Sequence, residues 1–245
     1  MLNFYKLYSD PNALFGYKDA HLKVPEIAWE VANTNEKKQE LEHLWASNPE
    51  YAFKYSHEVL RKPWSLGEEA IASNPKCAYW YAYYVTKGPW ARGESAIANN
   101  TEYAYMYACH VIKGPWEPCE KAIASDPKYA YMYAHRVIKG PWEPGEKVIA
   151  RKPYYAYTYA REVVNGVWPP GEEAIISNSY YAYMYAYHVI NGPWEPGEEA
   201  IASSACYAYQ YARNVIKNPW PPGEKAIASD PRWKQEYEQY FKVKL

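Results

Sequence analysis

The chain has 245 residues, with 27 Lys and Arg against 28 Asp and Glu, which gives a formal net charge of −1. This balance excludes the strongly basic surface of an ordinary duplex nucleic-acid binder. Hydrophobic residues make up 49% of the chain, and this content excludes a mainly disordered protein. No apolar run approaches the ~20 residues that cross a bilayer, so we expect neither a membrane span nor a membrane partner.

The cysteines and the first residues indicate the compartment. Residues 1–10 turn polar too early for a secretory signal. The cysteines show no C-x-x-C pair, so we expect reduced thiols rather than disulfides or a zinc site. They are Cys77, Cys109, Cys119 and Cys206. We therefore predict a cytoplasmic protein.

A fixed internal period organises the chain. A tryptophan recurs every 26 residues from Trp64 to Trp220, without insertion. Seven tandem repeats, numbered 1 to 7 and each counted from its position 1, begin at Pro49, Pro75, Thr101, Pro127, Pro153, Ser179 and Ala205. A constant period in the range of about 20 to 50 residues is typical of a solenoid.

The flanking segments are irregular versions of the same unit. Residues 1–48 are expected to form an N-terminal cap that holds one degenerate repeat over residues 25–48, in which Trp45 takes the place of an Ile. Residues 49–230 hold the seven repeats, and residues 231–245 are expected to form a charged C-terminal capping helix. The predicted fold is an all-α solenoid of helix pairs with atypical caps.

Each repeat predicts a longer and a shorter helix. In repeat 4, Asp126 is a suitable N-cap and Pro127 suits the first helical position. Gly140, followed by Pro141, is expected to end this helix. A second, shorter helix is expected from about Pro144 to about Arg151, with Glu146 in its first turn.

The periodicity separates a packed face from a free face of the long helix. At 100° per residue, positions 3, 4, 7, 8 and 11 share one arc, and Ala at 4, Tyr at 7 and Val at 11 recur in every repeat. The opposite positions 2, 6, 9, 10 and 13 differ among the repeats. The free face is therefore expected to carry specificity. The free face carries eleven Lys or Arg and only four Glu, and this excess of positive charge favours an acidic partner.

Three recurring residues have both structural and functional interpretations. The Glu at position 20 is either a ladder of carboxylates or, as we prefer, a cap that also accepts a bond from a buried Tyr hydroxyl. The Trp at position 16 is a stacking platform or, preferably, a buried anchor. The Tyr at position 5 forms an aromatic trough for a peptide or single-stranded nucleic acid or, preferably, packs against the short helix with its hydroxyl at the surface.

No pattern of residues points to catalysis. The sequence has no phosphate-binding glycine loop, no zinc-protease motif and no nucleophile elbow. His57 and His135 share position 9, and His110 and His188 share position 10, but the members of each pair lie three repeats apart. We predict that the protein is not an enzyme and uses no metal or other cofactor.

The motif Tyr-Ala-Tyr-Met-Tyr-Ala-x-x-Val-Ile-Lys-Gly-Pro-Trp-x-Pro-Gly-Glu resembles short helical-repeat proteins of tailed bacteriophages and bacteria, and more loosely tetratricopeptide and Sel1 repeats. The resemblance covers residues 49–230. It implies an α-solenoid and suggests a phage protein made in a bacterial cytoplasm. Cys119 stands where most repeats have Gly, which puts the local turn in question.

These features favour a protein that captures a protein or peptide partner, such as a phage-encoded inhibitor of a host protein. We expect aromatic anchors and charged residues of the free face to make the contact. They are Trp80, Tyr84, His110, His135, Arg136, Arg161, Tyr187, His188 and Arg213. The alternatives are a binder of a small anionic ligand or nucleotide, which sequesters a signal molecule, and a structural component of a virion.

Overall fold

The computed structural model describes residues 41–245. The predicted N-terminal cap, including most of the degenerate repeat, lies outside them. The chain divides into two compact units, Met1–Lys113 and Gly114–Leu245, and each is described by itself. Throughout the described residues the structure is helical, without a strand, as predicted for an all-α solenoid.

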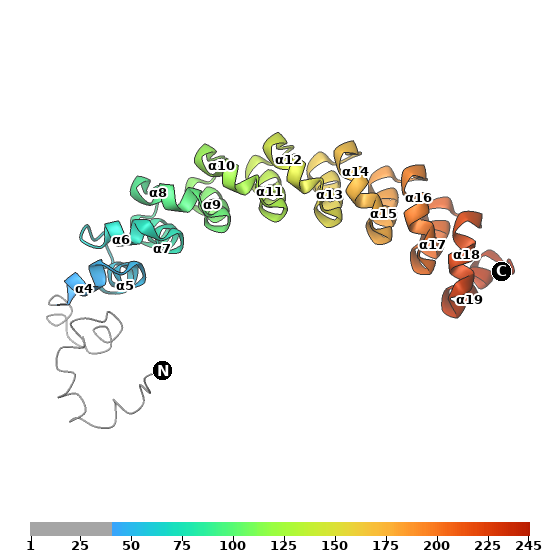
Figure 1. The fold of residues 1–245 in the computed structure, drawn as a ribbon, viewed down its shortest axis with the longest axis horizontal. Helices are drawn as coiled ribbons and strands as arrows, with labels where there is room; N and C mark the ends of the chain where they lie inside the picture. The colour runs from blue at the N-terminus through green and yellow to red at the C-terminus, as the bar shows by residue number, and fades with distance from the viewer. Residues whose placement is uncertain (1–40) are drawn as a thin grey trace, which may run out of the picture. The chain divides into compact units, whose positions relative to one another are not determined.

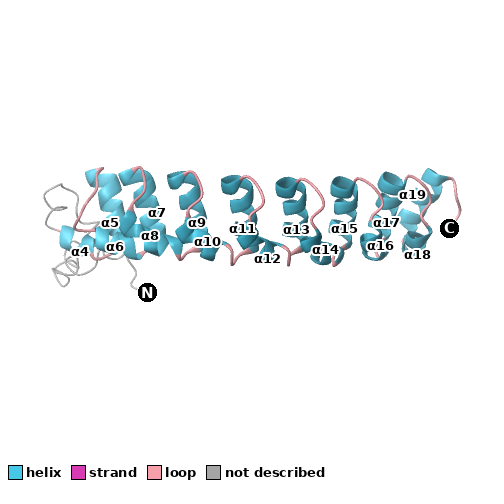
Figure 2. Cartoon of the chain, turned by 90° about the horizontal axis from the view of Figure 1, so that it is seen from above, coloured by secondary structure: helices cyan, strands magenta, loops and turns pink. Residues whose placement is uncertain are grey.

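In both units, long helices lie side by side in one row and short helices form a second row (Figure 1, Figure 2). The first unit contains α4 (Glu42–Ala46), α5 (Pro49–Lys54), η3 (Tyr55–Leu60), α6 (Glu68–Ser73), α7 (Pro75–Trp80), η4 (Tyr81–Thr86), α8 (Ala91–Ala98), α9 (Thr101–Tyr107) and η5 (Ala108–Ile112). Each long helix is one α segment followed directly by the η segment.

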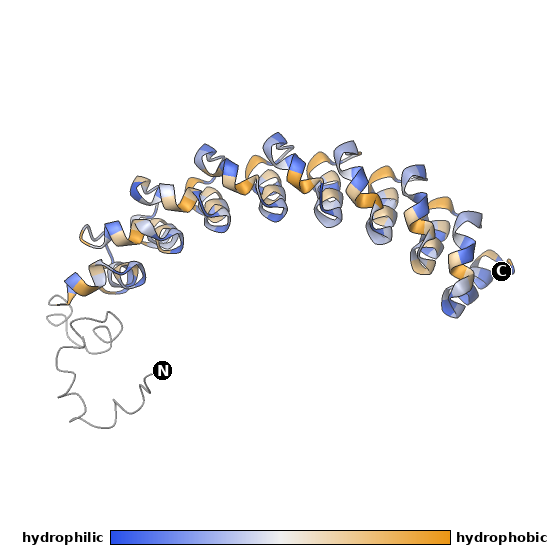
Figure 3. Ribbon diagram, viewed as in Figure 1, coloured by the Kyte–Doolittle hydropathy of each residue, from blue (hydrophilic) through white to orange (hydrophobic). Residues whose placement is uncertain are grey.

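The second unit continues the pattern and ends in a single longer helix. It contains α10 (Glu117–Ile123), α11 (Pro127–Tyr133), η6 (Ala134–Ile138), α12 (Glu143–Ile149), α13 (Pro153–Tyr159), η7 (Ala160–Val164), α14 (Pro169–Ile176), α15 (Ser179–Tyr185), η8 (Ala186–Ile190), α16 (Glu195–Ala202), α17 (Ala205–Tyr211), η9 (Ala212–Ile216), α18 (Pro221–Ser229) and α19 (Pro231–Phe241). Hydrophilic and hydrophobic residues alternate along the helices (Figure 3).

The start of the long helix follows the prediction. In repeat 4, the Asp126 carboxylate accepts the backbone N–H groups of Lys128 and Tyr129, at 2.9 and 3.1 Å. These bonds satisfy two of the donors that a helix N-terminus leaves free. The N-cap predicted for Asp126 is confirmed.

The second half of the long helix differs from the prediction, because it is a π-helix. A π-helix bonds each residue to the fifth residue onward and is rare outside single turns. The helix ends just before Gly140, at Ile138, as the sequence predicted, but Gly140 is not the left-handed residue. Lys139 takes the left-handed conformation instead, with φ of 61°, while Gly140 donates its N–H to the carbonyl of Ala134 at 3.2 Å. The same position is left-handed in every repeat, as Arg61, Lys87, Lys113, Asn165, Asn191 and Lys217.

A tyrosine at position 7 joins each repeat to the one before it. The Tyr133 ring is fully buried, and its hydroxyl donates to Glu120 Oε1 of the preceding repeat at 3.2 Å. The same hydroxyl accepts the backbone N–H of Trp116 at 2.9 Å. We call this arrangement the tyrosine relay. It recurs at Tyr81, Tyr107, Tyr159, Tyr185, Tyr211 and, from α19, Tyr237.

The relay explains the Glu at position 20. The predicted bond from a buried Tyr hydroxyl is confirmed. The capping role is indirect, because the Tyr hydroxyl, not the Glu, takes the N–H of the Trp that precedes the short helix. In the first described repeat, Tyr55 donates to Glu42 at 2.6 Å. Trp45 is fully buried in the place where later repeats have Ile.

The Trp at position 16 is a buried anchor, as preferred from the sequence. The Trp142 ring is 6% exposed and lies 4.8 Å, between centroids, from the ring of Tyr133. A Cβ built on Gly145 would lie 2.6 Å from this Trp ring and 3.0 Å from Ala130 Cβ. Repeat 3 has the fully buried Cys119 at this place, and its thiol donates to the Trp116 carbonyl, so the ring there must leave more room.

We expect Tyr133→Phe to lower the free energy of unfolding by about 1–3 kcal/mol, because it leaves the buried Trp116 N–H without its acceptor. The measurement is urea denaturation followed by far-UV circular dichroism. Tyr154→Phe is the matched control, since the Tyr154 ring is 48% exposed, and its effect should stay within about 0.5 kcal/mol. Equal effects of the two substitutions would contradict the role of the relay.

We expect Gly145→Ala to destabilise the chain by about 1–3 kcal/mol through overpacking against Trp142. Gly140→Ala is the control, because a Cβ there meets no heavy atom within 4 Å and Gly140 has no positive φ. It should be neutral or slightly stabilising. A thermal melt of both variants makes the comparison, and a melting temperature for Gly145→Ala at or above that of Gly140→Ala would rule out the tight contact.

The relay also predicts a loss of stability at alkaline pH. Burial, opposed in part by the Trp220 N–H and reinforced by Glu224, raises the pKa of Tyr237 to about 12 from an ordinary value of 10.0. Because the folded-state pKa is raised, this stability is fully present below pH 10 and is lost as the pH rises through the folded-state value. We expect tyrosinate absorbance at 295 nm to rise together with loss of helical signal. Full ionisation of all tyrosines with the helices intact would contradict this.

Candidate functional site

Positions 9 and 10 of the repeats vary from repeat to repeat and are accessible on the long helices. Both lie in the π-helical segments, and positions 11 and 12 separate them from the left-handed residue at position 13. At these two positions every side chain is exposed or half-buried, whereas positions 4, 7 and 8 of the same helices are buried in all repeats. Because the buried positions recur and the exposed ones do not, positions 9 and 10 form the candidate binding face.

The Tyr at position 5 packs beneath the side chains of this face. This side chain is buried in repeats 2, 3, 5, 6 and 7 and half-buried in repeat 4, so it packs within the fold. Its hydroxyl, which was expected at the surface, is instead hydrogen bonded to a side chain of the next repeat in three places. Its ring stacks on the side chain at position 9 of the same helix in several repeats. The centroid distances are 6.0 Å for Tyr79 and Tyr83, 5.7 Å for Tyr131 and His135, and 5.9 Å for Tyr183 and Tyr187.

The hydroxyl of the same tyrosine reaches position 10 of the next repeat. The Tyr79 hydroxyl and His110 Nδ1 are hydrogen bonded at 2.8 Å. The Tyr131 hydroxyl donates to the Glu162 carboxylate, and Asn214 Nδ2 donates to the Tyr183 hydroxyl at 2.8 Å. We call this contact the position-10 bridge. It holds the side chain at position 10 against the neighbouring helix.

The first unit carries a continuous aromatic surface, formed by His57, Trp80, Tyr83, Tyr84 and His110. Trp80 and Tyr84 stack with centroids 5.3 Å apart and planes at 14°, and His57 lies 5.0 Å from Tyr84. Tyr83 meets Tyr84 at 4.9 Å and His110 at 6.1 Å, both edge to face. Tyr83 and Tyr84 are 42% and 44% exposed, so rings of this surface are available to a partner.

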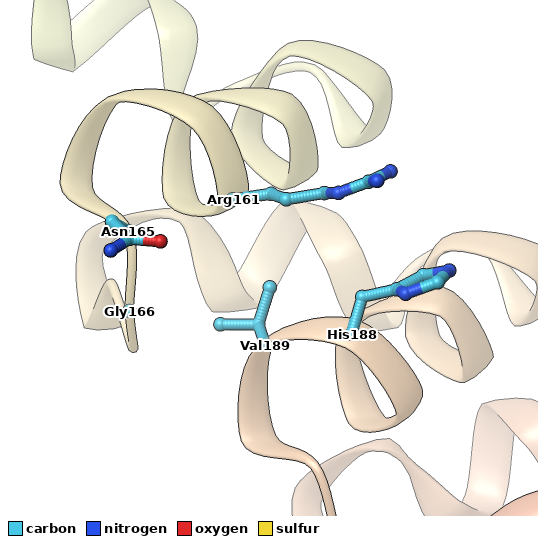
Figure 4. A pocket seen from close by; sticks show the side chains of 5 residues that line it. All are labelled: Arg161, Asn165, Gly166, His188 and Val189. Carbon is cyan, nitrogen blue, oxygen red and sulfur yellow. The ribbon is translucent and has the colours of Figure 1, made fainter.

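The second unit has a polar pocket of about 330 Å³ between η7 and η8. Arg161, Asn165, Gly166, His188 and Val189 line it, and we call it the Arg161 pocket. The side chains of Arg161 and His188 extend in the same direction from neighbouring helices, and Val189 lies next to His188 (Figure 4). Burial lowers the pKa of His188 below its ordinary value, and the positive charge of Arg161 lowers it further.

The structure brings some of the predicted site residues together and leaves others apart. Trp80, Tyr84 and His110 belong to the aromatic surface. Arg161 and His188 share the pocket, and the Tyr187 ring lies 4.7 Å from that of His188. The remaining three are exposed on their own helices.

Those three residues have local surroundings that differ. His135 stacks on Tyr131. The Arg213 guanidinium lies 4.8 Å above the ring of Tyr240, and it also donates to the Tyr209 hydroxyl at 3.3 Å. Arg136 is exposed on η6. None of the three joins the aromatic surface or the Arg161 pocket.

Sequence reasoning missed Tyr83 and His57, which complete the aromatic surface. Both stand at position 9, and the variability of that position was the available signal. It also missed the exposed Tyr154 and Tyr180 at position 2 of repeats 5 and 6. These are aromatic residues in exposed first turns, where a helical wheel expects polar residues.

The described residues show no cluster of three His, Cys, Asp or Glu side chains placed to hold a metal ion. Cys77 and Cys119 are buried. Burial raises the pKa of the Cys77 thiol to about 11, with Glu50 as a further cause, so it stays protonated at neutral pH. No helix among residues 41–245 is both long and apolar enough to cross a membrane.

No protein-family model matches the sequence, and comparisons with curated proteins and with solved structures likewise found no match. The resemblance to phage and bacterial helical repeats therefore stays a prediction from the repeat motif. What the chain binds has to be inferred from its own exposed side chains.

Proposed function

We propose that this chain is a non-enzymatic binding protein that captures a protein or peptide partner on positions 9 and 10 of its π-helical segments. One observation carries the proposal. The recurring residues are committed to internal contacts through the tyrosine relay, and in the described residues no fully buried side-chain nitrogen or oxygen lacks a hydrogen bond. The side chains that differ from repeat to repeat are the ones that remain accessible.

Two features of this face suit an interface. The aromatic surface of the first unit offers stacked, partly exposed rings, and such rings are enriched among the residues that dominate binding energy. In the second unit, Arg136 and Arg161 are exposed on η6 and η7. Arginine binds carboxylates through paired hydrogen bonds, so we propose an acidic partner. In line with the resemblance noted above, a phage-encoded inhibitor of a host protein is the setting we propose.

A second candidate is the binding of a small anionic ligand or nucleotide. The Arg161 pocket favours it, because Arg161 and His188 both line this hollow of about 330 Å³. Ligand pockets usually span about 300–1,000 Å³, so the volume is at the lower end of that range. Native mass spectrometry separates the two candidates, since a polypeptide and a ligand of a few hundred daltons differ plainly in mass.

We expect native mass spectrometry of the tagged protein, purified from a bacterial host at low salt, to show a polypeptide at fixed stoichiometry. Tyr84→Ala and Arg136→Glu should each weaken its binding about tenfold or more, because buried aromatic and arginine contacts at interfaces cost over about 1 kcal/mol when removed. Lys147→Glu, on the exposed side of the short helix α12, is the charge-reversal control. Unchanged affinity in both variants would contradict the proposed face.

A further inference from the structure

The Arg161 pocket departs from the pattern that its neighbours follow. In three other places the position-5 Tyr hydroxyl forms the position-10 bridge, to His110, Glu162 or Asn214. By this rule the Tyr157 hydroxyl would bond to His188, which stands at position 10 of the next repeat. Instead, Arg161 Nη1 donates to the Tyr157 hydroxyl at 3.1 Å. The bridge is replaced by a contact within one helix.

The replacement leaves hydrogen-bonding groups open in the pocket. Within the described chain, His188 makes a ring contact with Tyr187, but neither of its ring nitrogens has a hydrogen-bond partner. Arg161 has five N–H groups, and among residues 41–245 the one bond to Tyr157 is the only partner that the guanidinium has. Arg161 and His188 therefore present unused donors on the same side of the η7–η8 pair (Figure 4).

No carboxylate neutralises this positive site. Glu162, next to Arg161 in sequence, is held by the hydroxyl of Tyr131 on the helix before it. The three salt bridges among the described residues are Lys76 with Glu50, Arg92 with Glu68, and Lys234 with Glu238, so none of them involves Arg161. The lowered pKa of His188 reflects both its partial burial and the uncompensated charge of Arg161.

Arg213 makes the same contact as Arg161 within its helix, but its guanidinium is also covered by an aromatic ring. It stands at position 9, as Arg161 does, and it also donates to the position-5 Tyr hydroxyl of its own helix. In α19, Tyr240 stands where a following repeat would have its position 10. The centroid of the Tyr240 ring lies 4.8 Å from the Arg213 guanidinium. The cation–π contact occupies the face that Arg161 leaves open. Arg213 is therefore a matched internal control for Arg161.

We propose that the Arg161 pocket is an oxyanion subsite that binds one carboxylate or phosphate group through the Arg161 guanidinium and the His188 imidazole. The guanidinium supplies a planar pair of donors that matches either group, and His188 supplies a further donor from the neighbouring helix. The inference rests on the proposed function in one respect, which is that the bound group belongs to the captured partner.

The test uses inorganic phosphate and acetate as probes with the full chain. The chain has six histidines, and His188→Leu assigns the His188 ring signals in spectra of protein with 13C-labelled histidine. We expect those signals to shift with phosphate or acetate and to saturate. In the Arg161→Gln variant the apparent affinity should fall about tenfold or more, since hydrogen bonds to charged groups are the strong ones. Arg213→Gln should leave the titration unchanged.

The outcomes separate the subsite from the proposed function. Shifts that never saturate, or an equal effect of Arg161→Gln and Arg213→Gln, would overturn the subsite even where a captured partner is found. A saturable shift that is lost in Arg161→Gln, with the circular dichroism spectrum and the thermal melt unchanged, would support the subsite even where no polypeptide co-purifies. Saturation by phosphate alone identifies a phosphate group as the ligand, and saturation by acetate identifies a carboxylate.

Discussion

The tyrosine relay is the interaction on which the rest of the structure depends. Each short helix begins after a Trp whose N–H would be buried without a partner, and the hydroxyl of the next repeat's Tyr supplies the acceptor. The same hydroxyl donates a hydrogen bond to the carboxylate of the Glu at position 20. The Trp N–H and the Glu carboxylate therefore both have a partner. An unpaired group in this environment costs about 1–3 kcal/mol, which makes every repeat depend on its neighbour. A repeat of this kind cannot complete its own hydrogen bonds, and for that reason the last one is closed by Tyr237 of α19.

The sequence predicted the parts of this fold that depend on local chemistry and on period. The 26-residue spacing gave the helix pairs, Asp126 gave the N-cap, and Glu at position 20 gave the acceptor for a buried hydroxyl. It did not predict the π-helical segments, because a wheel at 100° per residue assumes α-helical winding throughout. Nor did it place the left-handed residue at Lys139, since Gly140 next to it is the residue type that prefers that conformation. Tertiary packing of the buried tyrosines outweighed both local preferences.

The sequence predicted which face of the long helices is variable, but not which of its residues lie next to one another. Variation among the repeats identified the free face, and nine residues were chosen there by size and charge, eight of them at positions 9 and 10 and Trp80 at position 6. Which of them meet depends on the neighbouring side chain one repeat away, and a single residue changes the result. Glu162 and Asn214 are held by a Tyr hydroxyl, whereas His188 is not, because Arg161 occupies that hydroxyl first. The sequence of a single repeat does not show which of two side chains on neighbouring helices will bind the same hydroxyl.

The π-helical segments connect the constant framework to the variable face. A left-handed conformation at a non-glycine residue costs roughly 1–2 kcal/mol, and here it recurs at Arg or Lys in five repeats and at Asn in two. The cost is tolerated where the surrounding bonds fix the backbone, and each segment is fixed at its start by the relay tyrosine and its neighbouring Trp. The π-helical turn ends each long helix with positions 9 and 10 accessible and with the small residue at position 8, Ala or in repeat 1 Ser56, still buried. Because no bond of the relay involves positions 9 and 10, their side chains can change in one repeat without loss of the contacts that join it to the next.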